Sequence, residues 1–361
     1  MKVVAALLSV LYFGAVITLV VKWTSFTDYL ERPGETSDAE AIEVVVVPEG
    51  TTATDVPGLL AKAGLLDDPE PFQRYVDDFH IARPIKPGEY AVTRSMTPVQ
   101  KLGRIESGQL VTYTVAIRPG ATANDVLGVL ASQTLGDEAE LARLVHDAEF
   151  AKSLGVNGTS LEGFLYPDAY DLPRGLTAKA LLSQLVERHR VVAGAEVAVA
   201  VQRHGMSPYE IVTVASLVES AEVPNAERRL YARLILNRLK RRMPLQSRAA
   251  YEYGVSRVDP AKLEPEAVRR KRRRRKRIHP WDTSKNAGLP KTPICNPDVE
   301  SIRAVAAAAD SEAVFMVRRD DGTHVYCADF ECYEAARYQV RGLAPPPPPP
   351  PPPPTEPAPT P

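Results

Sequence analysis

The 361-residue sequence has few of the residues that build disulfide frameworks and metal sites. It contains three cysteines and six scattered histidines. Cys295, Cys327 and Cys332 are too few for a disulfide scaffold and lack the paired spacing of a structural zinc site. A single bond between Cys327 and Cys332 and free or buried thiols both remain open. We expect no metal and no cofactor.

The sequence also lacks the motifs of several large enzyme classes. It has no phosphate-cradling loop, no G-x-S-x-G elbow, no H-E-x-x-H pair and no G-x-G-x-x-G fingerprint. The body of the chain is not basic either. The formal net charge is −1, and leaving out the nine consecutive basic residues Arg269 to Arg277 makes it −10. An acidic body argues against nucleic acid as a partner, because phosphate binding needs a basic surface.

One long apolar run is present near the N-terminus. Val3 to Val21 are nineteen positions without a charge, which at about 1.5 Å per residue can cross a bilayer core of roughly 30 Å. Lys22-Trp23 is typical of an interfacial anchor, and no small-x-small cleavage site follows. We therefore predict an uncleaved transmembrane anchor, with a cleaved signal peptide as the alternative. Lys2 and Lys22 flank the run equally, so charge leaves its orientation open.

The first folded segment has the pattern of a small α+β module. Ile42 to Val47 is a β-branched run that predicts a strand, and Thr52 to Asp55 supplies a capping box for a helix. An amphipathic helix around Phe72, a short strand at 89–92 and a helix around Leu102 follow. Strand, two helices and strand make up this module.

The same pattern recurs about seventy positions later, at Val115 to Ile117 and Thr122 to Asp125, which indicates an internal repeat. The chain that follows is mainly helical and ends in a predicted hairpin with Asp320-Asp321-Gly322 as its turn. Pro345 to Pro354 is an unbroken proline run, either a spacer or a ligand for a proline-binding partner. We predict an α+β fold in these segments: anchor 1–23, linker 24–40, small module 41–112, repeat-like connection 113–156, mixed, mainly helical domain 157–343, and proline-rich tail 344–361.

The best-marked helix carries a candidate acid. Ser207 and Glu210 form a capping box around Pro208 at the first helical position, and Val223-Pro224 is expected to end the helix. Glu219 then lies in the last turn, where the helix dipole and partial burial raise its pKa. A carboxylic acid that stays protonated near neutral pH can protonate the oxygen that leaves a glycosidic bond. The alternatives are that Glu219 pairs with Arg228 or Arg229, or that Glu222 is the acid.

Several segments resemble, in order and spacing, the motifs of the YceG-like endolytic murein transglycosylases. They are Ala215-Ser216-Leu217-Val218-Glu219, Glu227-Arg228, Leu236-Asn237-Arg238-Leu239, Met243-Pro244-Leu245-Gln246-Ser247 and Tyr253-Gly254. Two more agree: Leu161 to Asp168 resembles the family's EGYLFPDTY element, and Asn286 to Pro297 resembles its NAGLPPGPICNPG element. Together with the anchor and the repeat, the resemblance covers nearly everything before the proline tail.

The resemblance implies a lytic transglycosylase with Glu219 as its acid/base. Glu219 would protonate the oxygen that leaves C1 of N-acetylmuramic acid and then help the sugar's C6 hydroxyl attack, which gives 1,6-anhydro ends and limits strand elongation. It also implies a LysM-like glycan-binding first module, a catalytic domain outside the cytoplasmic membrane, and as partners peptidoglycan strands, the membrane and cell-wall synthesis proteins. We expect five residues to contact the sugar or to hold Glu219 in place: Gln246, Asn237, Tyr166, Glu162 and Asn286. For each of them, packing or capping is the alternative role.

Two elements depart from the family pattern. Arg248-Ala249-Ala250 stands in place of the usual Asp-Pro-Thr-Val, and His279 to Ser284 in place of Ser-Pro-Tyr-Asn-Thr-Tyr. They keep open a non-catalytic peptidoglycan-binding scaffold, although the retained Glu219 favours an enzyme. The basic run just before the second element is expected to be a solvated loop, with contacts to anionic lipid or wall polymer as alternatives.

Overall fold

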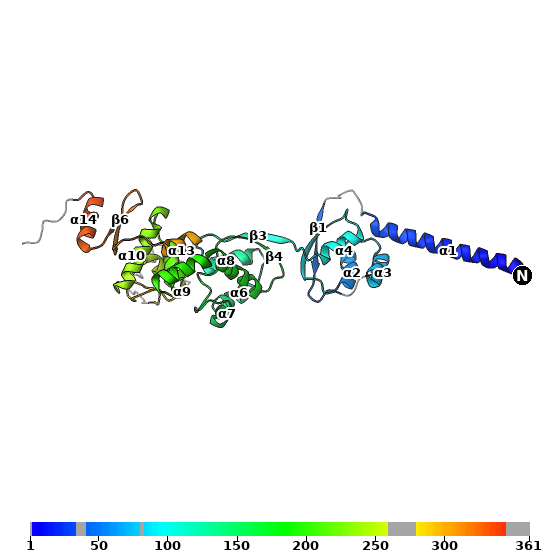
Figure 1. The fold of residues 1–361 in the computed structure, drawn as a ribbon, viewed down its shortest axis with the longest axis horizontal. Coiled ribbons are helices and arrows are strands. Elements are labelled where there is room, and N and C mark those ends of the chain that lie inside the picture. The colour runs from blue at the N-terminus through cyan, green and yellow to red at the C-terminus, as the bar shows by residue number, and fades with distance from the viewer. Residues whose placement is uncertain (1, 34–40, 80–82, 134, 259–278, 344–361) are drawn as a thin grey trace, which may run out of the picture. The chain divides into compact units, whose positions relative to one another are not determined.

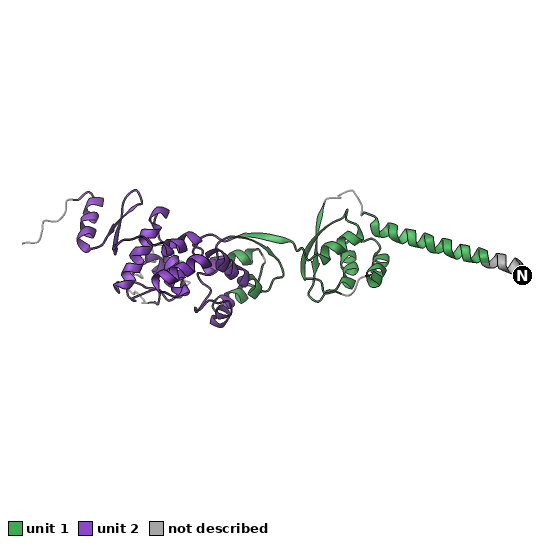
Figure 2. Cartoon of the chain, in the orientation of Figure 1, with its two compact units in different colours: residues 1–116, 128–141, 169–181 green, residues 117–127, 142–168, 182–361 purple. Residues whose placement is uncertain are grey.

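The computed structural model of the chain describes residues 2–33, 41–79, 83–133, 135–258 and 279–343. The basic run 269–277 and the proline run 345–354 lie outside these residues. The chain divides into two compact units (Figure 2). The first comprises residues 1–116, 128–141 and 169–181, and the second comprises residues 117–127, 142–168 and 182–361.

The N-terminal helix α1 (Lys2–Glu31) continues past the predicted anchor. Among the described residues it contains the one stretch, Ser9–Glu31, that is long and apolar enough to cross a membrane, so it fits a membrane anchor or a signal. The prediction that residues 24–31 form a linker is wrong. Phe26, Tyr29 and Leu30 pack against the core of the first unit, and this burial keeps the segment helical.

The small module of the first unit has the predicted order of strand, helices and strand (Figure 1). β1 (Ile42–Val47) pairs antiparallel with β2 (Gly88–Thr93), and Val45 lies opposite Tyr90. The helical elements η1 (Ala53–Asp55), α2 (Val56–Lys62), α3 (Pro69–Phe79) and α4 (Pro98–Glu106) contribute their apolar faces to one core. The predicted strand at Ile42–Val47 is confirmed.

The predicted second copy of the strand-and-cap pattern is also present. β3 (Thr112–Ala116) pairs antiparallel with β4 (Ala169–Pro173) and is followed along the chain by α5 (Ala123–Ser132), α6 (Glu138–Val145) and α7 (Ala148–Ser153). Thr122 and Asp125 exchange the same side-chain hydrogen bonds as Thr52 and Asp55 before the first helix.

The second unit is mainly helical. Its elements, with the long helix that leads into it, are α8 (Ala178–His204), α9 (Pro208–Glu219), η2 (Asn225–Glu227), α10 (Arg228–Lys240), α11 (Arg248–Val258), α13 (Val299–Ala306), β5 (Phe315–Arg318), β6 (His324–Cys327) and α14 (Phe330–Val340). β5 and β6 form the predicted antiparallel hairpin. Cys327 and Cys332 form a disulfide between β6 and α14, and Cys295 is buried with a free thiol. The predicted mainly helical α+β fold with an apolar N-terminal helix is confirmed.

Helix α9 ends earlier than the sequence predicted. Its last residue is Glu219, and Ser220 caps it by donating from its backbone N–H to the Ser216 carbonyl. The prediction that Val223-Pro224 ends the helix is therefore wrong, because the helix closes before the proline restricts it. Glu219 remains in the last turn, as predicted.

Candidate active site

Glu219 is the last residue of α9, a helix that is mostly buried. Its start is fixed by the predicted capping box, in which Ser207 Oγ accepts from the Glu210 N–H at 3.3 Å and Glu210 Oε2 accepts from the Ser207 N–H at 2.8 Å. Every residue from Ile211 to Val218 is buried. The Glu219 side chain is still only 6% exposed, so its carboxyl group lies mostly out of water.

The Glu219 carboxyl group contacts the beginning of α13. Its Oε2 accepts from the Asp298 N–H at 3.1 Å and from Ser301 Oγ at 2.8 Å. Asp298 is the N-cap of α13 and accepts from the Ser301 N–H at 2.8 Å. The helix end therefore presents donors to one oxygen of the carboxyl group.

The pKa of Glu219 is raised, as the sequence predicted. Burial is the main cause, because it disfavours the charged form, and the negative charge of Asp298 adds to it. The hydrogen bonds from the Ser301 hydroxyl and the Asp298 amide oppose the shift without cancelling it. Glu219 therefore holds a proton to higher pH than an ordinary glutamate.

The predicted alternative partner, Arg228, is also present in this cluster. Arg228 Nη2 lies 3.5 Å from Glu219 Oε1, while Nη1 lies 3.2 Å from Asp298 Oδ1 and 3.0 Å from Ser301 Oγ. The guanidinium is thus shared among the three groups, with its shorter contacts to Asp298 and Ser301. Arg229, the other predicted alternative, donates to the Ala307 carbonyl.

Glu222 lies in a different environment from Glu219. Its side chain is 86% exposed and pairs with Arg318 at 2.9 Å, beyond the end of α9. Glu222 therefore lacks the buried surroundings of Glu219, whose side chain is 6% exposed. The geometry therefore favours Glu219 over Glu222 as the acid.

Asn296 holds the chain around Glu219 together, and the sequence interpretation missed it. It is fully buried; its Oδ1 accepts from the Leu165 N–H at 2.9 Å, and its Nδ2 donates to the Ala121 carbonyl at 2.9 Å. Its own carbonyl accepts from the Gly120 N–H at 2.9 Å. Its place in the Pro-Ile-Cys-Asn-Pro segment, which resembles a family motif, was the sequence signal that could have identified it. Asp298 and Ser301 had no comparable signal.

Gly120→Ala is expected to destabilise the protein by about 1–2 kcal/mol, because Gly120 has φ +75° and an L side chain is strained there. A Cβ at this position would also lie 3.7 Å from Cγ of Glu219. Gly128→Ala is the matched control: Gly128 lies inside α5 with open space around it, so the change is expected to stabilise by roughly 0.5–1 kcal/mol. Chemical denaturation followed by circular dichroism measures the free energy of unfolding of both variants. Equal changes in the two variants would contradict backbone strain at Gly120.

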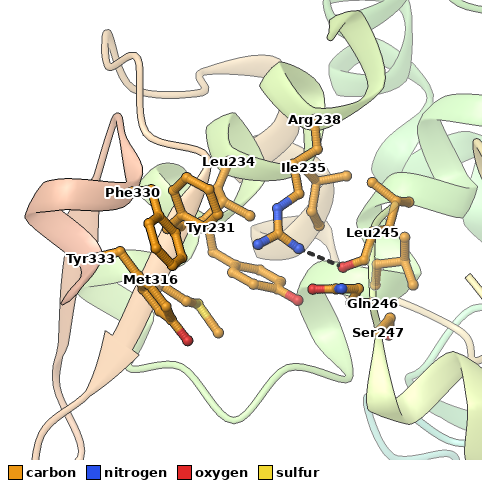
Figure 3. A pocket seen from close by; sticks show the side chains of 12 residues that line it. Tyr231, Leu234, Ile235, Arg238, Leu245, Gln246, Ser247, Met316, Phe330 and Tyr333 are labelled. Carbon is orange, nitrogen blue, oxygen red and sulfur yellow. Dashed lines mark hydrogen bonds between the residues drawn. The ribbon is translucent and has the colours of Figure 1, made fainter. Parts of the chain in front are cut away.

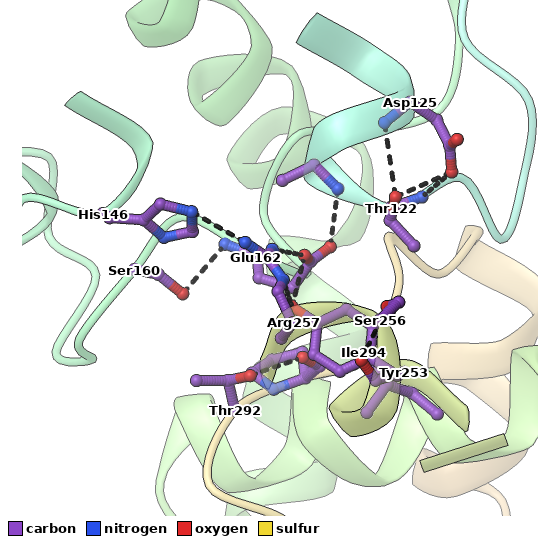
Figure 4. A network of polar contacts seen from close by, with 12 residues as sticks. Thr122, Asp125, His146, Ser160, Glu162, Tyr253, Ser256, Arg257, Thr292 and Ile294 are labelled. Carbon is purple, nitrogen blue, oxygen red and sulfur yellow. Dashed lines mark hydrogen bonds and ion pairs between the residues drawn. The ribbon is translucent and has the colours of Figure 1, made fainter. Parts of the chain in front are cut away.

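Glu162 lies at the centre of a buried polar network (Figure 4). It has no exposed surface; its Oε1 accepts from the Ala123 N–H at 2.8 Å, and its Oε2 accepts from Tyr253 at 2.7 Å and from Arg257 at 2.8 Å. Burial raises its pKa, while Tyr253 and Arg257 oppose the rise. Arg257 also contacts His146 Nε2 at 2.7 Å. Of the roles expected for Glu162, these contacts favour an internal packing role.

The other residues predicted to bind sugar occupy different settings. Asn237 is buried and donates to the carbonyls of Ser311 and Ala313 at 2.8 and 3.0 Å, so it holds the chain before β5. Asn286 donates to two carbonyls of its own loop. Tyr166 is buried, with its hydroxyl bonded to the backbone of Val299 in α13. For these three, the structure shows bonds that position other segments.

Gln246 is the member of the predicted set that is exposed. Its backbone lies at φ 54°, a left-handed conformation that is uncommon for a residue other than glycine. Its side chain lines a cavity of about 390 Å³ together with residues of α10, β5 and α14 (Figure 3). Leu217 also lines this cavity but Glu219 does not. The two residues are about 160° apart around the axis of α9, at about 100° per residue, so the cavity and the acid lie on different faces of the helix.

Residues 45–339 match the YceG-like family, a range that contains Glu219, Asn296 and the groups around them. The chain belongs to the YceG-like family. The family resemblance read from the motifs is therefore confirmed.

Named relatives are similar over most of the chain. An endolytic murein transglycosylase of Streptococcus pneumoniae is 26% identical over 331 residues, which cover 79% of this chain and 56% of the relative. One of Bacillus subtilis is 22% identical over 327 residues, covering 83% and 85%. This chain spans about half the length of the streptococcal relatives. A crystal structure of a YceG-like protein from Listeria monocytogenes has the same fold, with a TM-score of 0.52 at 21% identity over 82% of this chain and 99% of that one.

Proposed function

We propose that this chain is an endolytic lytic transglycosylase that cleaves the MurNAc-GlcNAc bond of nascent peptidoglycan strands. The observation that carries the proposal is Glu219, a carboxyl group with a raised pKa at the end of a buried helix, in a segment that resembles the family's acid-bearing motif. Relatives from two genera bear the name endolytic murein transglycosylase, which supports the same reaction here.

In this proposal Glu219 acts first as acid and then as base. It donates its proton to the glycosidic oxygen as the bond from C1 of N-acetylmuramic acid to that oxygen breaks. The C6 hydroxyl of the same sugar then bonds to C1 and returns its proton to Glu219. No water is consumed, so one carboxyl group suffices, unlike the two that ordinary glycosidases use. The donors Asp298 N–H and Ser301 Oγ stabilise Glu219 in its charged state between the two steps.

Ser301→Ala tests this arrangement through the pH dependence of kcat/KM. The Ser301 hydroxyl lowers the pKa of Glu219, so removing it raises that pKa further. Because the reaction begins with protonated Glu219, the high-pH limb of the profile is expected to move to higher pH. Ser256→Ala, which removes a hydroxyl bonded to the Tyr253 carbonyl, should leave the limb in place. A limb that stays fixed or moves to lower pH in Ser301→Ala would contradict the assignment.

The remaining parts fit a membrane-bound wall enzyme. The strand-helix-helix-strand module at 41–112 supports a LysM-like domain that binds glycan, and α1 supports a single-pass anchor that holds the catalytic domain at 157–343 outside the cytoplasmic (inner) membrane. In this location the enzyme would limit strand elongation beside cell-wall synthesis proteins. Exposed Gln246 is the proposed sugar contact, while Tyr166, Asn237, Asn286 and Glu162 hold the surrounding chain.

The test is strand shortening by the full chain in detergent. Purified glycan strands are incubated with the protein, and their length distribution is followed by size-exclusion chromatography. Internal cleavage is expected to shorten long strands early, before short fragments accumulate. Strands that bind but keep their length would support the non-catalytic scaffold instead.

A further inference from the structure

A groove runs between β5 and α14, away from the proposed acid. Two cavities, of about 390 and 290 Å³, share Met316 of β5 and Tyr333 of α14 as walls, so they adjoin. The larger one reaches Gln246, and the smaller one reaches Arg341, at the end of α14. The groove therefore follows the length of α14.

One face of α14 lines this groove with aromatic and arginine side chains. Phe330, Tyr333, Arg337 and Arg341 are spaced three or four residues apart, which places them on one side of the helix. Phe330 is 56% exposed, and the Arg337 guanidinium lies 5.5 Å from the Tyr333 ring centroid. The Cys327–Cys332 disulfide ties this helix to the hairpin. The result is an exposed aromatic surface on a fixed frame.

Such a surface suits a polyproline II ligand. Proline-rich segments dock in aromatic-lined grooves, and they lose little entropy because their backbone is already fixed. A proline run offers backbone carbonyl acceptors and no N–H donors, while arginine offers donors and no acceptors. Arg337 and Arg341 therefore match its hydrogen-bonding needs.

The chain carries such a ligand directly after the groove. Ten consecutive prolines begin at residue 345, four positions beyond Arg341. At Gly342, φ 63°, the helix ends in a Schellman motif: the Leu343 N–H donates to the Tyr338 carbonyl at 2.9 Å and the Gly342 N–H to the Gln339 carbonyl at 3.1 Å. This motif turns the chain off the helix axis at the arginine end of the groove.

Length allows the run to return along the groove. Ten prolines in polyproline II extend about 31 Å, whereas the eleven residues of α14 extend about 16 Å. We propose that the groove between β5 and α14 binds residues 345–354 of the same chain. The groove includes Gln246, the proposed sugar contact, but not Glu219, and its occupancy is tested by peptide binding without measuring the proposed reaction.

The test is competition with a free peptide. A fluorescein-labelled decaproline is titrated with the full chain in detergent and with a variant whose residues 345–354 are a Gly-Ser repeat of equal length, and anisotropy reports binding. The variant is expected to bind the peptide, and the natural chain at least tenfold more weakly, because a tethered segment acts at an effective concentration of about millimolar. Equal binding to both proteins, or no binding to the variant, would overturn the proposal.

Point variants in the Gly-Ser background locate the site. Phe330→Ser and Arg337→Ala are each expected to weaken peptide binding, Phe330→Ser by at least tenfold. Phe79→Ser is the matched control, because Phe79 is 62% exposed, as Phe330 is 56%, and belongs to the first unit. Unchanged binding in both groove variants would place the peptide elsewhere and overturn the assignment. If the difference in peptide binding between the natural chain and the Gly-Ser variant disappears when the protein is diluted, the groove binds the tail of a second copy. That result would overturn binding within one chain.

Discussion

Replacing Glu219 by glutamine is expected to lower the rate of glycan cleavage by about 10²–10⁴-fold, the usual contribution of a general acid/base. Glutamine keeps the size of the side chain but cannot donate the proton that the leaving oxygen needs. The α13 donors can still bond its amide oxygen, so folding should be retained. The rate of release of new chain ends measures the effect, and circular dichroism checks the fold.

Glu222→Gln is the matched control for this prediction. It makes the same chemical change three positions along the chain, on a side chain that is 86% exposed. We expect its rate to stay within about twofold of the natural chain, since an exposed ion pair contributes little. An inactive Glu222→Gln with an active Glu219→Gln would sink the assignment of the acid.

Glu162→Ala is expected to cost about 3–5 kcal/mol of stability, the largest folding effect we anticipate. Removing one partner of a buried ion pair leaves the other charge without compensation. Here Arg257, the Tyr253 hydroxyl and the Ala123 N–H would all lose their acceptor in the network of Figure 4. Denaturant unfolding measures the loss.

The control for this effect lies on α11, the helix that carries Tyr253 and Arg257. Glu252→Ala on α11 removes the partner of Arg248, in a pair whose side chains are 83% and 53% exposed. Exposed pairs at this spacing contribute about 0.3–0.5 kcal/mol, so the change should be small. Similar losses in Glu162→Ala and Glu252→Ala would mean that the buried network does not stabilise the second unit.

Local patterns predicted the elements best. The capping box at Ser207 predicted the start of α9 correctly, whereas Val223-Pro224 predicted its end too late; Glu219 lies in the last turn all the same. The β-branched run at Ile42–Val47 predicted β1, and Asp320-Asp321-Gly322 predicted the turn between β5 and β6. These signals depend on residues within a few positions of each other, so the sequence displays them directly.

Contacts between residues far apart in the sequence could not be predicted from such local patterns. Asp298 and Ser301, which bond Glu219, are 79 and 82 positions away along the chain. The helical state of residues 24–31 depends on packing of Phe26, Tyr29 and Leu30 against residues that follow much later. Polar residues such as Asn237 and Glu162 look suited to sugar binding in a motif, yet their partners are internal. Tertiary contacts decide these roles.

The most direct test of the central claim is the chemistry of the new chain ends. Glycan strands are cleaved by the full chain in water enriched in ¹⁸O, and the products are analysed by mass spectrometry. We predict 1,6-anhydro-muramic ends, lighter by one water than reducing ends and free of ¹⁸O, that are absent with Glu219→Gln. New reducing ends that carry ¹⁸O, in excess of those in strands kept in the same water without the protein, would mean that water attacks C1, and would contradict the transglycosylase mechanism.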